Sequence, residues 1–244
     1  MPQNASVPAE TDTLCEHCGY GLNGLPTDGL CPECGQPIAD STTGDGRTLP
    51  TWETETATPT SRFIRTTRQI IFSPARFFRN LTTRAPLDRP RAFSNVHQWI
   101  QAVLLGATAA LHFQWMLTVS TRSVDSWLLI IYAVVLTLLA RALLWGITVL
   151  ASFLSRVEGR YWGYRLPATA VRRVMYYHAA QMLPVATMVF VTVAGFRVLR
   201  ATHILDGMAD VKYLVVLSIE VLVAAAYLFR TYWIAMKNVM YANR

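Results

Sequence analysis

The chain has 244 residues, of which 52% are hydrophobic and only 15% are charged, and its formal net charge is +7. These values fit a polytopic membrane protein with a soluble appendage. The charge is uneven: residues 1–60 carry nine acidic residues and one basic residue, whereas residues 61–244 carry 21 basic and six acidic residues. The acidic N-terminal part lacks the cations that neutralise phosphates, which argues against nucleic acid as its partner.

Residues 1–13 are polar and are predicted to be disordered. The four cysteines of the chain follow as two Cys-x2-Cys pairs, and each pair precedes a glycine. Four thiolates at this spacing are typical of tetrahedral zinc, and glycine allows the positive φ that turns backbone N–H groups toward the sulfurs. We therefore predict a small β-rich ribbon over residues 14–39 with structural Zn2+. The alternative is that two disulfides, rather than a metal ion, stabilise so small a module. The predicted metal ligands are Cys15, Cys18, Cys31 and Cys34.

Residues 40–61 are rich in Thr, Pro and Gly without periodicity, which predicts a flexible linker. Residues 62–97 begin with apolar side chains interspersed with arginines, a composition typical of amphipathic helices in the membrane interface. Ser73-Pro74 predicts the start of a second short helix, because serine is a favoured N-cap and proline a favoured first helical residue. The residues expected to contact the interface are Phe63, Ile64, Arg65, Arg68, Ile71, Phe72, Arg76, Phe77, Phe78 and Arg79.

Four long apolar segments lie within residues 98–240, and about 20 residues suffice to cross a bilayer. The predicted spans are about 99–119, 127–154, 174–196 and 213–234. They predict an all-α polytopic membrane domain with four transmembrane helices. The second segment is too long for one straight crossing and too short for two, so it should tilt, protrude or break. A fifth span hidden within it is the alternative.

The orientation of the spans follows from the basic residues between them, because cytoplasmic loops carry the excess of Lys and Arg. Sixteen bases lie in the segments before the first span, between the second and third, and after the fourth, against four in the other two loops. This places both termini in the cytoplasm, with the protein in the inner (cytoplasmic) membrane. The thiols then face a reducing compartment, which favours zinc over disulfides.

Arg141 and Glu220 are charged residues within predicted spans, where a charge costs at least about 2.5–3.5 kcal/mol. Their depths allow a salt bridge between them, and the alternative is that Arg141 reaches the cytoplasmic surface with its long side chain. Four further polar residues in the spans are expected to hydrogen-bond between helices rather than to carry substrate. These are His112, Gln114, His178 and Gln181.

The membrane half, residues 61–240, resembles the Yip family of integral membrane proteins. The resemblance rests on the stretches Ile71 to Leu81, Ala92-Phe93 and Met175 to Pro184, and on the clustered spans. It implies a helical membrane fold, usually of five spans, whose eukaryotic members interact with Rab-type GTPases in vesicle traffic. The four spans counted here depart from that pattern. The ribbon resembles the short four-cysteine heads of many small bacterial membrane proteins, and neither resemblance implies catalytic residues.

No catalytic motif of the GxSxG, HExxH, Walker or GxGxxG type occurs in the chain. We therefore expect a non-enzymatic membrane protein whose cytoplasmic zinc ribbon binds a protein partner, with the lipid bilayer as its second partner. One alternative is a transporter or channel for ions or small solutes that uses Arg141 and Glu220. The other is a metal or thiol-redox sensor. A homo-oligomer is compatible with each of these functions.

Overall fold

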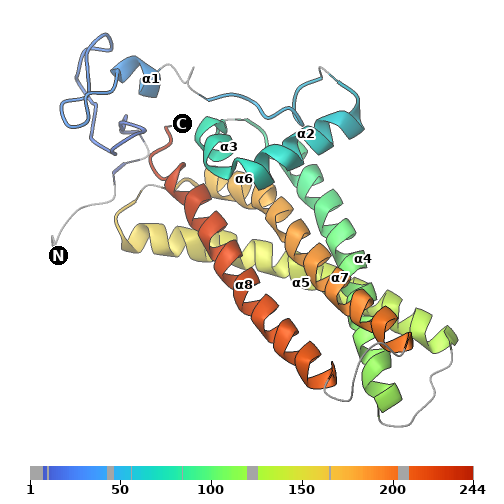
Figure 1. Cartoon of the computed structure of the whole chain (residues 1–244). Coiled ribbons are helices and arrows are strands. Elements are labelled where there is room, and N and C mark those ends of the chain that lie inside the picture. The colour runs from blue at the N-terminus through green and yellow to red at the C-terminus, as the bar shows by residue number, and fades with distance from the viewer. Residues whose placement is uncertain are drawn as a thin grey trace. The chain divides into compact units, whose positions relative to one another are not determined.

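The computed structural model of the protein describes most of the chain, and outside the N-terminal ribbon the described residues are largely helical (Figure 1). The described residues are 8–9, 11–42, 47–55, 57–83, 85–119, 126–164, 166–202 and 209–243. Residues 1–7 and 10, most of the segment predicted to be disordered, lie outside them. The α-helices are α1 (Ile38–Thr42), α2 (Pro59–Phe72), α3 (Pro74–Asn80), α4 (Asp88–Val119), α5 (Ser126–Tyr161), α6 (Ala168–His178), α7 (Met182–Ala201) and α8 (Ala209–Lys237).

Contacts divide the chain into two compact units, each of which is discontinuous in sequence. The first unit combines Met1–Ser94 with Thr148–Ala180 and Thr231–Arg244. It contains the ribbon, α2, α3 and α6. The second unit combines Asn95–Ile147 with Gln181–Arg230, and it contains the larger parts of α4, α5, α7 and α8.

Four helices are long and apolar enough to cross a membrane, which indicates a membrane protein. These candidate spans are Asp88–Leu117, Trp127–Tyr161, Ala168–Ala201 and Asp210–Lys237. The second is one continuous helix, because no proline interrupts residues 126–161 and its two isolated glycines, Gly146 and Gly159, are tolerated within a helix. At 1.5 Å per residue its 36 residues extend over about 54 Å. The long apolar segment therefore forms one helix and contains no fifth span.

The third candidate span is interrupted by a short 3-10 turn over Ala179–Gln181, between α6 and α7. Pro184 follows within the first turn of α7. Proline has no N–H to donate to the carbonyl of Ala180, and its ring clashes with that carbonyl. The interruption of the regular α-helix thus lies directly before Pro184, and the missing N–H and the clash of the proline ring account for it.

In the second unit, α4 and α5 approach closely at Gly106. A methyl group added to Gly106 would lie 2.1 Å from Thr137 Oγ1 and 2.7 Å from its Cα. Ala102 and Ala110, one turn before and after Gly106, are buried. Small residues at every fourth position let the backbones of two helices meet.

The first unit has an aromatic and aliphatic core drawn from α2, α3, α4, α6 and α8. Phe78, Phe93 and Tyr177 are fully buried, and the Phe93 and Tyr177 rings lie 5.1 Å apart. Phe77 is 8% exposed and packs edge-on against Phe78 and Tyr177. The sequence analysis placed Phe77 and Phe78 at the membrane interface, whereas the structure buries both. The predicted helix break at Ser73-Pro74 is confirmed, because α2 ends at Phe72 and α3 begins at Pro74.

Residues 47–55, within the segment predicted to be a flexible linker, pack against this core. Trp52 lies against Phe63 and Phe93, with ring centroids 6.0 and 5.8 Å apart.

The neighbouring Glu53 side chain is 5% exposed and forms an ion pair with Arg173, which is fully buried on α6. Arg173 also donates to the carbonyls of Ala85 and Pro86, and the Tyr177 hydroxyl donates to Glu53. These contacts hold the segment across α2, α4 and α6.

Candidate metal centre

The N-terminal ribbon consists of two turns that repeat each other with an offset of 16 residues. In the first, the N–H of Cys15 donates to the Tyr20 carbonyl at 2.8 Å, and that of Gly19 donates to the Cys15 carbonyl at 2.8 Å. In the second, the N–H of Cys31 donates to the Gln36 carbonyl at 2.8 Å, and that of Gly35 to the Cys31 carbonyl at 2.9 Å. Each turn is thus a Cys-x2-Cys-Gly knuckle closed by the same two hydrogen bonds.

The glycine of each knuckle adopts a conformation that other residues rarely take. Gly19 has φ of +83° and Gly35 has φ of +71°, both in the left-handed region. A side chain at either position would strain the turn that aims backbone N–H groups at the sulfurs. This conformation explains why both Cys-x2-Cys pairs precede glycine.

The four sulfurs come together at the distances that a tetrahedral ion requires. They all lie within 4.8 Å of one another, with Cys15 Sγ 3.5 Å from Cys34 Sγ and Cys18 Sγ 3.7 Å from Cys31 Sγ. Zinc–sulfur bonds of about 2.3 Å in a tetrahedron place neighbouring sulfurs about 3.8 Å apart. The predicted ligands therefore form one cluster that could hold a metal ion.

Without a metal ion, the thiols of Cys18 and Cys31 differ in pKa. Burial raises the pKa of Cys18 to about 12. Burial also opposes ionisation of Cys31, but hydrogen bonds from the backbone N–H groups of Cys34 and Glu33 lower its pKa to about 7. Metal binding must therefore displace thiol protons, and the ion supplies the positive charge that lets all four thiolates coexist.

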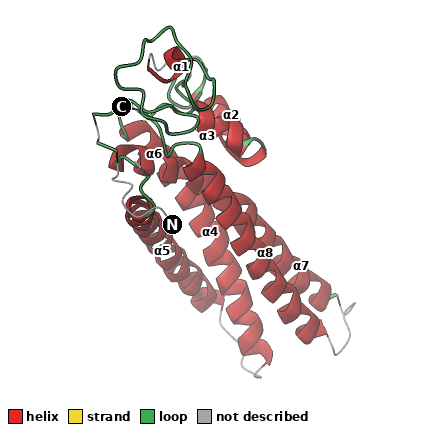
Figure 2. Cartoon of the chain, turned by 90° about the vertical axis from the view of Figure 1, so that its left-hand side faces the viewer, coloured by secondary structure: helices red, strands yellow, loops and turns green. Residues whose placement is uncertain are grey.

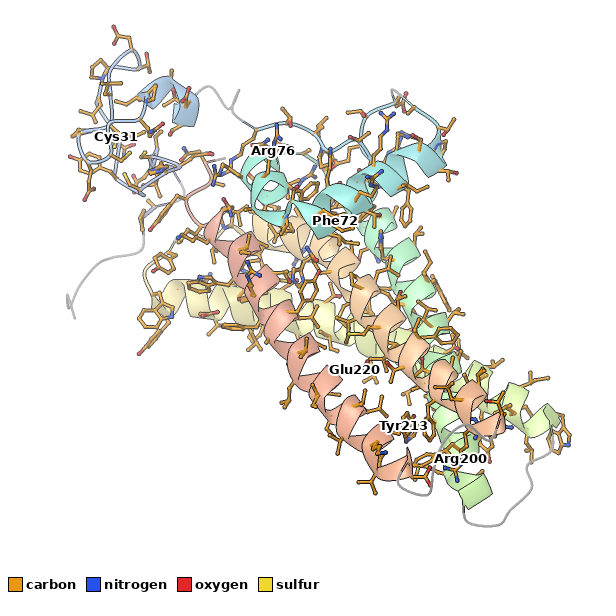
Figure 3. The ribbon with its side chains drawn as sticks, in the orientation of Figure 1. Cys31, Phe72, Arg76, Arg200, Tyr213 and Glu220 are labelled. Carbon is orange, nitrogen blue, oxygen red and sulfur yellow. The ribbon has the colours of Figure 1, made fainter. Side chains whose placement is uncertain are left out.

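The ribbon has little hydrophobic core of its own. Its core cluster of buried residues consists of Cys15, Leu22, Cys31 and Ile38, and Cys31 is labelled in Figure 3. Among the described residues it contains isolated bridges, Leu14 with Gly21 and Leu30 with Pro37, and no strand (Figure 2). The β-rich character expected of the ribbon is thus not confirmed, because each knuckle turns back after a single bridge. The fold of a module of this size needs additional stabilisation, for example by a bound metal ion.

The first knuckle is docked on the C-terminal residues of the same unit (Figure 1). The side-chain amide of Asn243 accepts from the N–H of Leu14 at 2.9 Å and donates to the carbonyls of Leu14 and Ser41 at 2.7 and 2.8 Å. Asn243 is 7% exposed, and its own N–H donates to the Glu16 carboxylate at 3.0 Å. One carboxamide therefore satisfies three backbone groups of the ribbon.

Two further contacts reinforce this attachment. Glu16, inside the first Cys-x2-Cys pair, forms an ion pair with Arg47, which also donates to the carbonyls of Leu81 and Asn238. The ring of Tyr241 lies so close to Gly19 that an added methyl group would lie 2.5 Å from it. Through Arg47, the metal-ligand loop is thus linked to the residues that directly follow α3 and α8.

Replacing Asn243 with Ala is expected to loosen the ribbon from the first unit while leaving the helices folded. The change leaves buried backbone groups of Leu14 and Ser41 without partners, at about 1–3 kcal/mol each. The measurement is hydrogen exchange of the ribbon amides in the metal-loaded protein. The matched control is Asn238→Ala, because among the described residues the Asn238 side chain bonds to the Ile234 carbonyl of the preceding helical turn and not to the ribbon. Equal exchange in both variants would contradict the prediction.

Arg141 and Glu220, between which the sequence allowed a salt bridge, do not pair with each other in the structure. Arg141 donates to Asn95 at 3.0 Å and lies over the Trp99 ring, 5.5 Å from its centroid. Glu220, labelled in Figure 3, accepts a hydrogen bond from the Thr192 hydroxyl, and its second carboxylate oxygen is buried without a partner among the described residues. Each charged side chain therefore finds a separate partner on a neighbouring helix of the second unit.

The expectation that polar residues in the spans bond between helices is confirmed. In the second unit His112 pairs with Tyr213 at 2.7 Å, Gln114 accepts from Arg197, and Gln181 accepts from Tyr227. In the first unit His178 pairs with Thr231 at 3.1 Å. These contacts hold the helices of each unit together.

The other residues predicted for the membrane interface divide into two groups. Phe63 packs against the core of the first unit and Ile71 is partly buried. The exposed residues are Ile64, Arg65, Arg68, Phe72, Arg76 and Arg79, and Phe72 is 77% exposed. The exposed surface of α2 and α3 is therefore rich in arginine, with Ile64 and Phe72 as its apolar members.

Sequence reasoning missed the residues that attach the ribbon and the linker: Asn243, Glu53 and Arg173. No local pattern marks them, because their partners lie 120 to 229 positions away in the chain. For Glu53, the only signal in the sequence was that an acidic residue lies within the predicted linker. Comparison with protein-family models, with curated proteins and with solved structures finds no match to this chain.

Proposed function

We propose that the protein is a non-enzymatic membrane scaffold whose zinc-stapled ribbon binds a protein partner. One observation carries this proposal: the two knuckles are equivalent in structure but not in environment. The first is covered by the chain's own C-terminal residues, whereas Leu30 in the second is 64% exposed. Leu30 corresponds to Leu14, the residue whose backbone pairs with Asn243, by the 16-residue offset.

The backbone geometry of the second knuckle supports a binding role. Around Leu30 the bonds Ile38 N–H to Gly29 and Cys31 N–H to Gln36 close the bridge, so the N–H and carbonyl of Leu30 face outward. The corresponding residue of the first knuckle is Leu14, and the carboxamide of Asn243 forms hydrogen bonds with both its N–H and its carbonyl. A partner segment with an Asn or Gln side chain could make the same pair of hydrogen bonds at Leu30.

The metal in this proposal is zinc with a structural role. Four cysteines complete a tetrahedral shell, which leaves no position for a substrate and makes the site unsuited to metal catalysis. The chemistry of four thiolates favours zinc among the abundant divalent ions. The proposed orientation, with the ribbon in the cytoplasm of a cell with an inner membrane, is supported by the distribution of basic residues between the candidate spans.

The relation to the Yip family is part of the same proposal. It is supported by the Ile71 to Leu81 stretch, whose Phe77, Phe78 and Leu81 are buried in the core of the first unit. The proposal takes from the family its role as a membrane-embedded binding protein and no particular partner.

A photo-crosslinking amino acid in place of Leu30 is expected to trap a partner protein in cells. The same reagent at Thr27, which is exposed in the loop between the knuckles, is the matched control. The adduct from Leu30 should disappear when Cys15 and Cys18 are replaced with Ser, because the knuckles lose their geometry without metal. An adduct of the same mass from both positions, or one that survives the cysteine substitutions, would count against a ribbon-borne binding surface.

A further inference from the structure

The first unit contains a surface pocket of about 420 Å3 that no part of the proposed function uses. Its walls are the end of α2, the exposed side of α3, and residues Thr48 to Thr51, which run beside them. A volume of this size lies within the range of small-molecule sites. It exceeds the space that a single inorganic anion would fill.

The lining of this pocket combines polar side chains with four apolar residues, Leu49, Pro50, Phe77 and Leu81, and it carries one charge. Arg76 supplies a guanidinium, Gln69 and Asn80 supply carboxamides, and hydroxyls come from Thr48, Thr51 and Ser73. None of the described residues that line the pocket is acidic. Such a set offers donors for an anion and both donors and acceptors for hydroxyl groups.

Arg76 is not used elsewhere in the described part of the chain. It is exposed, and none of the ion pairs or hydrogen bonds of the described residues involves its side chain. Two acidic residues follow Thr51 in the chain, and both form ion pairs with other arginines: Glu53 with Arg173, and Glu55 with Arg89. Among the described residues, no carboxylate therefore pairs with the guanidinium that lines the pocket.

The surroundings favour a negatively charged ligand. Helices α2 and α3 contain five arginines and no acidic residue. Exposed Arg65, Arg68 and Arg79 add to the positive potential around Arg76, which raises the local concentration of anions. Arginine binds phosphate through two parallel N–H donors, a stronger and more directional contact than a lysine makes.

We propose that this pocket binds a phosphate ester of a small polyol, with the phosphate on Arg76 and the hydroxyls on Gln69, Asn80 and the threonines. Two sources have this chemistry: a soluble glycerol phosphate and the head group of an anionic glycerophospholipid. Phe72, 77% exposed and adjacent to the pocket residue Ser73, would contact the acyl chains in the second case (Figure 3).

The test uses the full-length, metal-loaded protein and has one arm for each source. In neutral detergent, sn-glycerol 3-phosphate is titrated by calorimetry. In lipid nanodiscs, retention of phosphatidylglycerol against phosphatidylcholine is counted by native mass spectrometry. Saturable binding in the first arm identifies a soluble ester, and selective retention in the second identifies a lipid head group; either supports the proposal.

The decisive comparison is Arg76→Gln with Arg79→Gln, two exposed arginines of the same short helix of which only Arg76 lines the pocket. Arg76→Gln should weaken binding at least tenfold and Arg79→Gln by no more than twofold. Arg76→Lys, which keeps the charge and loses the paired donors, should fall between them. Absence of binding in both arms, or equal losses in the two Gln variants, would overturn the proposal. Equal thermal midpoints of the free proteins establish that each variant is folded.

Discussion

Replacing Cys31 with Ser is expected to unfold the ribbon over residues 14–38 and to release the metal. Structural zinc contributes about 10–16 kcal/mol in comparable peptides, far more than the small buried cluster of this module can supply. Three ligands also leave the tetrahedral shell open to water. The measurement is metal content per protein together with hydrogen exchange of the ribbon amides.

The control for this experiment is His17→Ala. His17 lies between two of the ligands but is exposed and outside the sulfur cluster, so its loss should leave metal content unchanged. Chelation of the wild-type protein should reproduce the Cys31→Ser result, since metal-bound and folded states form together. A ribbon that stays protected from exchange after complete metal removal would show that its contacts with Asn243 and Arg47 suffice to fold it.

Replacing Glu53 with Gln is expected to destabilise the first unit by about 3–5 kcal/mol, because it leaves the buried guanidinium of Arg173 without its counter-charge. Tyr177 would also lose a charged acceptor. The measurement is the free energy of unfolding from proteolysis of the segment near Trp52 at increasing denaturant. Adding Arg173→Met to Glu53→Gln should restore much of the loss, since an apolar side chain of similar length needs no counter-ion.

Glu55 is a matched control for Glu53. It lies two residues away and also pairs with an arginine, Arg89, but their side chains are 83% and 53% exposed. Exposed ion pairs contribute about 0–1 kcal/mol, so Glu55→Gln should be close to neutral. Comparable losses in the Glu53 and Glu55 variants would show that burial of the Arg173 pair does not govern the stability of this segment.

The membrane helices and the metal ligands were predictable because their signals are local. About 20 apolar residues in a row predict a span from solvation alone. Three of the four predicted spans lie within a single helix of the structure, and the third runs from α6 through the 3-10 turn into α7. Two Cys-x2-Cys-Gly turns predict a cluster because each pair brings its own sulfurs together. The helix break at Ser73-Pro74 follows in the same way from the restricted backbone of proline.

The contacts of charged residues were less predictable, as Arg141 and Glu220 illustrate. Their depths within two spans permitted a salt bridge, but depth does not determine which way each side chain points around its helix. Helix packing in the second unit places Arg141 beside Asn95 and Trp99, and Glu220 beside Thr192. Likewise, the alternation of Phe and Arg in Phe77, Phe78 and Arg79 suggested an interface, whereas α3 turns both phenylalanines into the core.

The sequence by itself thus determined the spans, the ligand set and the glycines of the knuckles, since each depends on residues close together in the chain. The tertiary structure alone decided that the linker carries a buried ion pair, and that Asn243 covers one knuckle while the other stays exposed. These features join residues more than 100 positions apart, and their energies depend on burial. Burial is a property of the packed chain that no short stretch of sequence contains.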